Sequence, residues 1–172
     1  MSRLLRILAA IALFLTTTAG GAAAQPAARP NVVLVIADDL GWGDLGSYGS
    51  PIMRTPRLDR LAAEGVRFTA AYVAAAVCSP SRAGLMTGRY PQRHGYEFNT
   101  SGRDVEIGLS TGERTLGDLM RGAGYATGYV GKWHLGRRPA QQPLSRGFNE
   151  YFGLLTGGTT YFAGDHPEAV LD

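Results

Sequence analysis

The sequence has little of three things: cysteine, surplus charge and long apolar segments. Cys78 is the single cysteine among 172 residues, so an internal disulfide is excluded. After the first 24 residues, no apolar run is long enough to span a membrane. Without Arg3 and Arg6, the 17 basic residues become fifteen against 14 acidic ones, which leaves a net charge near +1. This balance gives no support to a nucleic-acid partner.

The N-terminus has the pattern of an export signal. Its two arginines precede the continuously apolar run Ile7–Leu15, and Ala22–Ala24 offers a cleavage site of small residues. We therefore expect residues 1–24 to be a secretory signal peptide and residues 25–30 to be a short leader. The mature protein is then expected to be periplasmic or secreted, with no membrane span.

The residues that follow predict an α/β fold with a mostly parallel central sheet flanked by helices. Val32–Ala37 is a continuous apolar run rich in β-branched residues, typical of a strand buried on both faces of such a sheet. The turn-rich segment after Gly136 gives no clear assignment. Two more strands are expected over Val66–Val73 and Tyr125–Val130, and helices over Thr55–Gly65, Ser79–Thr87 and from Thr115 to Gly122 or Gly124, each opened by a capping residue or a proline.

Polar and reactive side chains follow each of the three expected strands. Asp38 and Asp39 come after the first strand, Cys78 after the second, and Lys132 and His134 after the third. Binding sites of open α/β sheets lie beyond the carboxyl ends of the strands. We therefore expect these five residues to meet at one edge of the sheet.

Asp38 and Asp39 indicate a metal site. Two adjacent carboxylates repel each other unless a cation lies beside them. Oxygen ligands favour a hard ion, calcium or magnesium, over zinc. The alternative is an exposed acidic turn, to which the nearby Asp44 would contribute.

Cys78 is expected just outside the N-terminus of a short helix, where backbone N–H groups and the helix dipole favour an anion. Arg82 lies about one helical turn further on and could turn its fixed positive charge to the same place. The alternatives are a buried, inert cysteine and an ordinary surface arginine.

Lys132 and His134 are two residues apart at a strand end, so their side chains are expected on the same side. This arrangement would hold a cation and a proton-transfer group together. The alternative for His134 is a purely structural role.

Two short motifs carry a family resemblance. The run Cys78-Ser79-Pro80-Ser81-Arg82 is followed by Thr87-Gly88-Arg89, and Gly131-Lys132-Trp133-His134-Leu135-Gly136 comes later. With three further blocks in the same order, residues 30–162 resemble the type I sulfatases, which share the alkaline-phosphatase-like fold.

The resemblance implies that Cys78 is oxidised to formylglycine (3-oxoalanine) by a formylglycine-generating or sulfatase-maturing enzyme. It further implies that Asp38, Asp39 and the modified Cys78 bind calcium, with magnesium less favoured, and that Arg82 stabilises residue 78. The hydrated aldehyde would then attack the sulfur of a sulfate ester, such as a sulfated carbohydrate. Lys132 would bind the sulfate, and His134 would help to break down the sulfated intermediate.

Length is where the chain departs from this family, whose members are much longer. Residues 31–172 are therefore expected to be the N-terminal part of a sulfatase catalytic domain, from a truncated gene product or an incomplete sequence. A phosphoester or phosphonate monoester hydrolase of the same superfamily and an inactive fragment both remain open as alternatives. His94 lies in a stretch that the family uses for support, and His166 is given no role.

Overall fold

The computed structural model describes residues 29–100, 107–158 and 169–171. The chain divides into two units, Met1–Ala37 and Asp38–Asp172. The signal peptide expected over residues 1–24 lies outside the described residues. The strand expected over Val32–Ala37 is wrong, because these residues are exposed and form no regular secondary structure. An apolar, β-branched run favours a strand, but a strand also needs a neighbour for its backbone groups.

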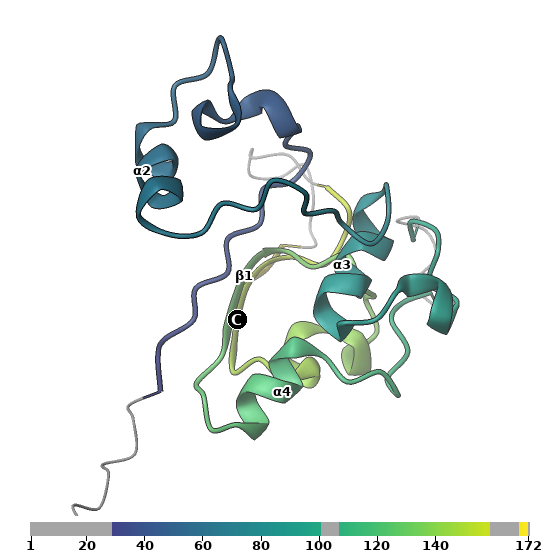
Figure 1. The fold of residues 1–172 in the computed structure, drawn as a ribbon. Coiled ribbons are helices and arrows are strands. Elements are labelled where there is room, and N and C mark those ends of the chain that lie inside the picture. The colour runs from purple at the N-terminus through teal and green to yellow at the C-terminus, as the bar shows by residue number, and fades with distance from the viewer. Residues whose placement is uncertain (1–28, 101–106, 159–168, 172) are drawn as a thin grey trace, which may run out of the picture. The chain divides into compact units, whose positions relative to one another are not determined.

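Three helices of the second unit lie close to the ranges expected from the sequence (Figure 1). Helix α2, Pro56–Glu64, begins after Thr55 and ends at Gly65. Helix α3, Cys78–Thr87, ends at Gly88, whose φ of 66° suits glycine. Its first residue is Cys78 itself, which was expected just outside the helix. Helix α4, Leu116–Gly122, opens with a capping box between Thr115 and Asp118. Short 3₁₀ helices cover Trp42–Asp44, Gly46–Tyr48, Pro91–His94, Pro139–Gln141 and Pro143–Arg146.

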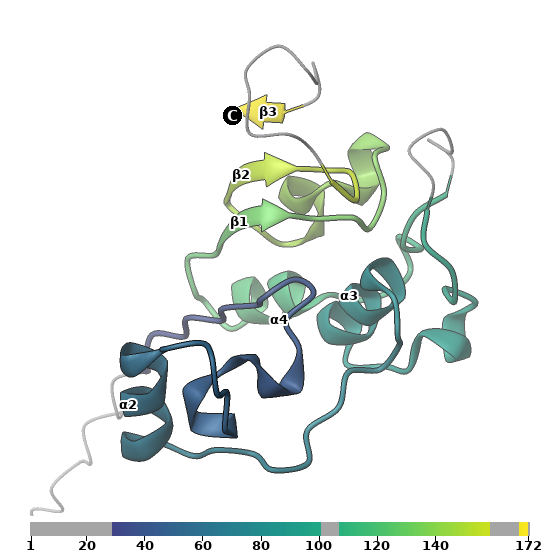
Figure 2. The same cartoon turned by 90° about the horizontal axis from the view of Figure 1, so that it is seen from above.

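The sheet has three described strands in the order β1–β2–β3: Gly128–Lys132, Glu150–Leu154 and Ala169–Leu171 (Figure 2). The first pair is parallel and the second is antiparallel. The strand expected over Tyr125–Val130 therefore exists but starts three residues later, and Val66–Val73 forms no strand. Strand β2 lies in the turn-rich segment that the sequence left unassigned. Parallel pairing brings the carboxyl ends of β1 and β2 to the same edge.

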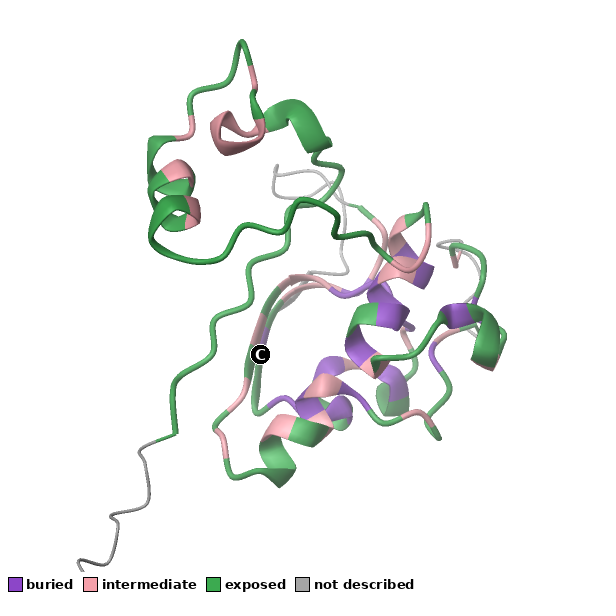
Figure 3. Ribbon diagram, viewed as in Figure 1, coloured by how far each residue is buried: buried purple, intermediate pink, exposed green. Residues whose placement is uncertain are grey.

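One face of the sheet is buried and the other is open. Tyr129 and Tyr151, which pair across β1 and β2, contribute to the inner face, while Val130 and Phe152 are 80% and 58% exposed. The buried apolar residues gather where α3, α4 and the sheet meet (Figure 3). They are Ala83, Met86, Tyr96, Leu109, Trp133, Leu135, Phe148, Tyr151 and Leu155. In the part of the chain that the structure describes, no helix is long and apolar enough to cross a membrane.

Candidate functional site

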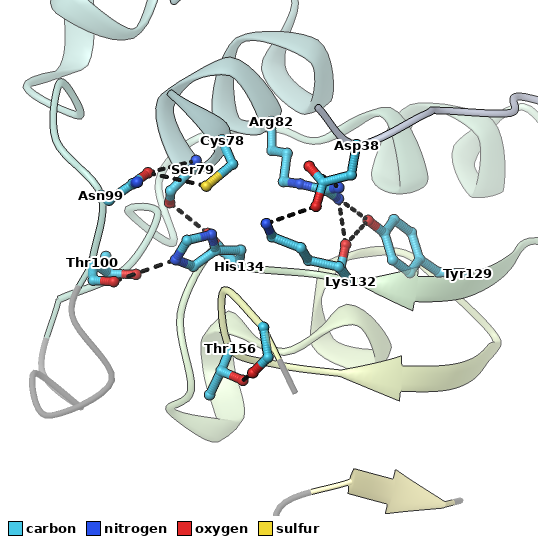
Figure 4. A network of polar contacts seen from close by, with 11 residues as sticks. Asp38, Cys78, Ser79, Arg82, Asn99, Thr100, Tyr129, Lys132, His134 and Thr156 are labelled. Atoms are coloured by element: carbon cyan, nitrogen blue, oxygen red, sulfur yellow. Dashed lines mark hydrogen bonds and ion pairs between the residues drawn. The ribbon is translucent and has the colours of Figure 1, made fainter. Parts of the chain in front are cut away.

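Three segments far apart in the sequence deliver polar side chains to one place in the second unit (Figure 4). They are Asp38, the first turn and a half of α3, and the end of β1 with the residues that follow it. The site therefore lies at the carboxyl end of β1, as expected for an open α/β sheet. This convergence occurs although two of the three expected strands are missing.

The Asp38 carboxylate forms ion pairs with two cationic side chains. Its Oδ2 lies 2.9 Å from Nζ of Lys132, and its Oδ1 lies 3.4 Å from Nη2 of Arg82. The hydrogen bond from Lys132, helped by the positive charges of Lys132 and Arg82, holds the pKa of Asp38 below its ordinary value of 3.8. Asp38 is therefore a carboxylate at neutral pH, and the structure brings these three predicted residues together.

The guanidinium of Arg82 is fixed by the backbone of β1. Its Nη1 donates to the carbonyl oxygen of Lys132 and to the hydroxyl of Tyr129, which lies 3.2 Å away. The Tyr129 hydroxyl donates in turn to the same carbonyl at 2.6 Å. Burial raises the pKa of Tyr129, so its hydroxyl keeps the proton that it donates. The Arg82 side chain is only 10% exposed, which makes it a rigid, partly desolvated positive charge.

Cys78 has a half-buried thiol at the start of α3. The N-cap residue, Val77, has no side chain that could accept a hydrogen bond from the helix. Asn99 fills this role from a separate loop: its Oδ1 accepts from the backbone N–H of Ser79 at 2.9 Å and lies 3.5 Å from Sγ of Cys78. The hydroxyl of Ser79 donates to the backbone carbonyl of His134 at 2.5 Å, which ties the helix to the residues after β1.

His134 is buried, with 5% of its surface exposed, and has a left-handed backbone with φ of 57°. Its Nε2 lies 3.3 Å from the carbonyl oxygen of Thr100, which can only accept, so this contact places the proton on Nε2. Nδ1 is then an acceptor, and it has no hydrogen-bond partner among the described residues. Burial lowers the pKa of His134 below its ordinary value of 6.5, so the imidazole is neutral at pH 7.

Gly157, beyond the carboxyl end of β2, packs directly against the His134 ring. A Cβ at this position would lie 2.6 Å from Cε1 and 2.8 Å from Nε2 of the imidazole. The close approach of this backbone requires glycine and limits the space in which the ring can move.

The carboxylates fit only part of a calcium site. Asp39 is exposed, and Asp38 is already engaged by Lys132 and Arg82. No group of three or more His, Cys, Asp or Glu residues suited to a metal ion occurs in the described ranges. Calcium takes about six to eight oxygen ligands, so the two aspartates have the right chemistry but are too few to hold the ion alone.

The sequence did not predict the residues that position the site's functional side chains. Two further histidines, His94 and His166, were not expected to belong to the site. Asn99 and Thr100 belong to no recognisable motif, and nothing in the sequence pointed to them. Tyr129 was read only as part of a strand. His94 lies in the 3₁₀ helix Pro91–His94, with its ring 6.4 Å from that of Tyr96. His166 lies outside the described residues.

The chain is similar to proteins of one family. A profile of the sulfatase family matches residues 30–167. N-acetylgalactosamine-6-sulfatase of Sus scrofa is 48% identical over 150 residues, which cover 82% of this chain and 28% of the relative. Arylsulfatase A of Bos taurus is 49% identical over 144 residues, which cover 83% of this chain and 28% of the relative. The crystal structure of Ps i-CgsB in complex with k-i-k-neocarrahexaose has a TM-score of 0.76 at 46% identity, covering 78% of this chain and 30% of that one.

Proposed function

The chain belongs to the type I sulfatase family, and on this premise we propose that it forms the nucleophile-bearing part of a sulfuric ester hydrolase. It spans about 28% of the length of the curated relatives that it matches. One observation carries the proposal: Arg82, Lys132 and the start of α3 with Cys78 are gathered at the carboxyl end of β1.

Arg82 and Lys132 are suited to binding the sulfate group. Both are cations with side chains 10% and 13% exposed, so their charges are weakly screened by water. The N-terminus of α3 adds backbone N–H groups that favour a negative charge. Groups held in place in this way stabilise charge that develops on sulfate oxygens in the transition state.

Residue 78 would act as the nucleophile after modification. We propose that a maturing enzyme oxidises Cys78 to formylglycine, whose hydrated aldehyde supplies an oxygen nucleophile for sulfate esters. Asp38 and Asp39 would contribute to a calcium site together with ligands outside the described residues. Calcium would offset the negative charge that develops on the reacting oxygen.

His134 would accept a proton during turnover. Its Nε2 keeps a proton against the carbonyl of Thr100, which leaves Nδ1 of the neutral ring as an acceptor without a partner among the described residues. A neutral imidazole next to a reacting hydroxyl is an effective base near pH 7. Ser79 supports this role because its hydroxyl holds the backbone carbonyl of His134.

A sulfated carbohydrate is the substrate class that we propose. The names of two similar proteins point this way: one is an N-acetylgalactosamine-6-sulfatase, and the other was solved with a neocarrahexaose. Lys132 and Arg82 suit the sulfate group and not the sugar. The sequence of residues 1–24 supports export, and we propose a periplasmic or secreted enzyme.

The test uses the protein produced together with a formylglycine-generating enzyme. Mass spectrometry of the peptide that contains residue 78 should show an aldehyde in place of the thiol. The modified protein should hydrolyse an aryl sulfate faster than the matching aryl phosphate, and Cys78→Ala should abolish this turnover. A preference for the phosphate would favour a phosphoester hydrolase. An intact thiol in an active protein would contradict the proposal.

A further inference from the structure

Asn99 contacts the residue that we propose as the nucleophile, yet no family motif and no step described above includes it. It comes from a loop, and it reaches α3 across a sequence separation of 20 residues. Its Oδ1 accepts from the backbone N–H of Ser79 at 2.9 Å and lies 3.5 Å from Sγ of Cys78. Figure 4 shows the Asn99 amide directed at the start of α3.

The hydrogen bond to Ser79 settles which atom of the amide faces Cys78. A backbone N–H can only donate, so the amide atom that it meets must be the oxygen. The side chain of residue 78 therefore meets an acceptor. A thiol is a weak donor to such an oxygen, whereas a hydroxyl is a strong one. The contact suits an oxygen-bearing residue 78 better than cysteine.

The loop that carries Asn99 is anchored on both sides of it. The hydroxyl of Tyr96 lies 2.9 Å from Oγ of Ser79, and the carbonyl of Thr100 accepts from Nε2 of His134 at 3.3 Å. The position of Asn99 is thus set by contacts to both the helix and His134. Side chains supported in this way hold a reacting group more accurately than a free loop could.

We propose, on the basis of the proposed function, that Asn99 is a positioning residue for the modified residue 78. Its Oδ1 accepts a hydrogen bond from a hydroxyl of the hydrated formylglycine. Hydration adds one water across the aldehyde C=O: the water oxygen bonds to carbon, and one of its protons moves to the former carbonyl oxygen. No oxidant or reductant is involved. Because the aldehyde has no O–H to donate, Asn99 favours the hydrate.

The experiment measures the free aldehyde rather than turnover. The modified protein is treated with an aminooxy probe, which reacts with the aldehyde, and oxime formation at residue 78 is followed by mass spectrometry. In Asn99→Leu, which fills similar space but accepts no hydrogen bond, we expect the oxime to form about fivefold faster than in the wild type. Asn99→Asp keeps an acceptor and should react at close to the wild-type rate. Asn99→Ala carries the same expectation as the leucine variant if that variant does not fold.

Asn149 offers a matched control. Its Oδ1 accepts from the backbone N–H of Thr127 at 3.0 Å and from the Thr127 hydroxyl at 2.9 Å, so it caps the start of the β1 segment instead of α3. Asn149→Leu should label at the wild-type rate, and an equal acceleration there would overturn the inference.

Two results would separate this inference from the proposed function. A wild type that carries formylglycine, with an Asn99→Leu variant that labels no faster, overturns the role of Asn99 alone. A wild type without formylglycine overturns the proposed function, and the role of Asn99 with it.

Discussion

His134 has a neutral, buried imidazole whose properties follow from its immediate contacts. The carbonyl of Thr100 holds the proton on Nε2, and burial lowers the pKa of the imidazole. Both effects come from atoms that touch the ring, so they can be tested with single substitutions. The same is true of Asp38, whose charge is set by Lys132 and Arg82.

Burial of His134 makes stability depend on pH in one direction. Its folded pKa lies below the ordinary value of 6.5, so the unfolded chain binds the proton more readily. The contribution of His134 to stability is fully present above about pH 6.5 and is lost as the pH falls below that value. Urea denaturation of the wild type and of His134→Asn across this range should show the loss in the wild type alone. Equal pH dependence in both proteins would contradict the prediction.

Gly157 provides a second test at this scale. A methyl group there would lie 2.6 Å from Cε1 of His134, so Gly157→Ala should displace the ring and lower kcat for an aryl sulfate by about tenfold or more. The next residue, Gly158, is a matched control because a Cβ there meets no atom of the described residues within 4 Å. Gly158→Ala should keep wild-type kcat. Equal kcat for both variants would show that the ring tolerates the methyl group.

At the scale of elements, α4 depends on its first turn. The hydroxyl of Thr115 accepts from the backbone N–H of Asp118 at 3.1 Å and lies 2.7 Å from the carbonyl oxygen of Arg146. Thr115 is 1% exposed, so water cannot replace these contacts. The cap therefore also joins α4 to the segment that leads into β2.

Removing the cap should destabilise the fold. We expect Thr115→Ala to lower the free energy of unfolding by about 1–2 kcal/mol, because it leaves buried backbone groups unpaired. Thr115→Ser keeps the hydroxyl and should lose clearly less. Urea denaturation followed by circular dichroism measures both. Identical losses would mean that the methyl group, and not the cap, stabilises this helix.

The helices could be predicted from the sequence and the strands largely could not. The signals that bound α2 and α4, such as Thr55, Gly65 and Thr115, lie within a few residues of the helix that they cap. A strand depends on a partner far away in the sequence. Val66–Val73 has the composition of a strand and forms none, whereas β2 pairs with β1 although its own segment is rich in turns.

At the scale of the whole molecule, the described residues form part of a site. Asp38, Arg82 and Lys132 could be predicted to meet because each lies in or beside a motif at a segment end. Asn99, Thr100 and Tyr129 could not, because their roles come from contacts made only in the folded chain. A calcium site here would need further ligands, because Asp38 and Asp39 are too few to enclose the ion and the described residues offer no group of three or more His, Cys, Asp or Glu side chains.

Calcium binding tests whether Asp38 and Asp39 are too few to hold the ion. Isothermal titration of the 172-residue chain with calcium should give weak or no binding heat. Any heat that Asp38→Asn and Asp39→Asn remove comes from the site, and heat that persists in both variants comes from elsewhere. Tight binding that is lost in these variants would show that the described carboxylates suffice.

Asp39 and His134 share a backbone conformation that most residues avoid, with φ of 58° and 57°. An L-amino acid pays about 1–2 kcal/mol for it, and glycine does not. Glycine at either position would relax the chain and delete the carboxylate or the imidazole. Laboratory evolution for heat resistance alone would therefore select glycine at these positions. The resulting protein would be more stable but would lack the carboxylate or the imidazole.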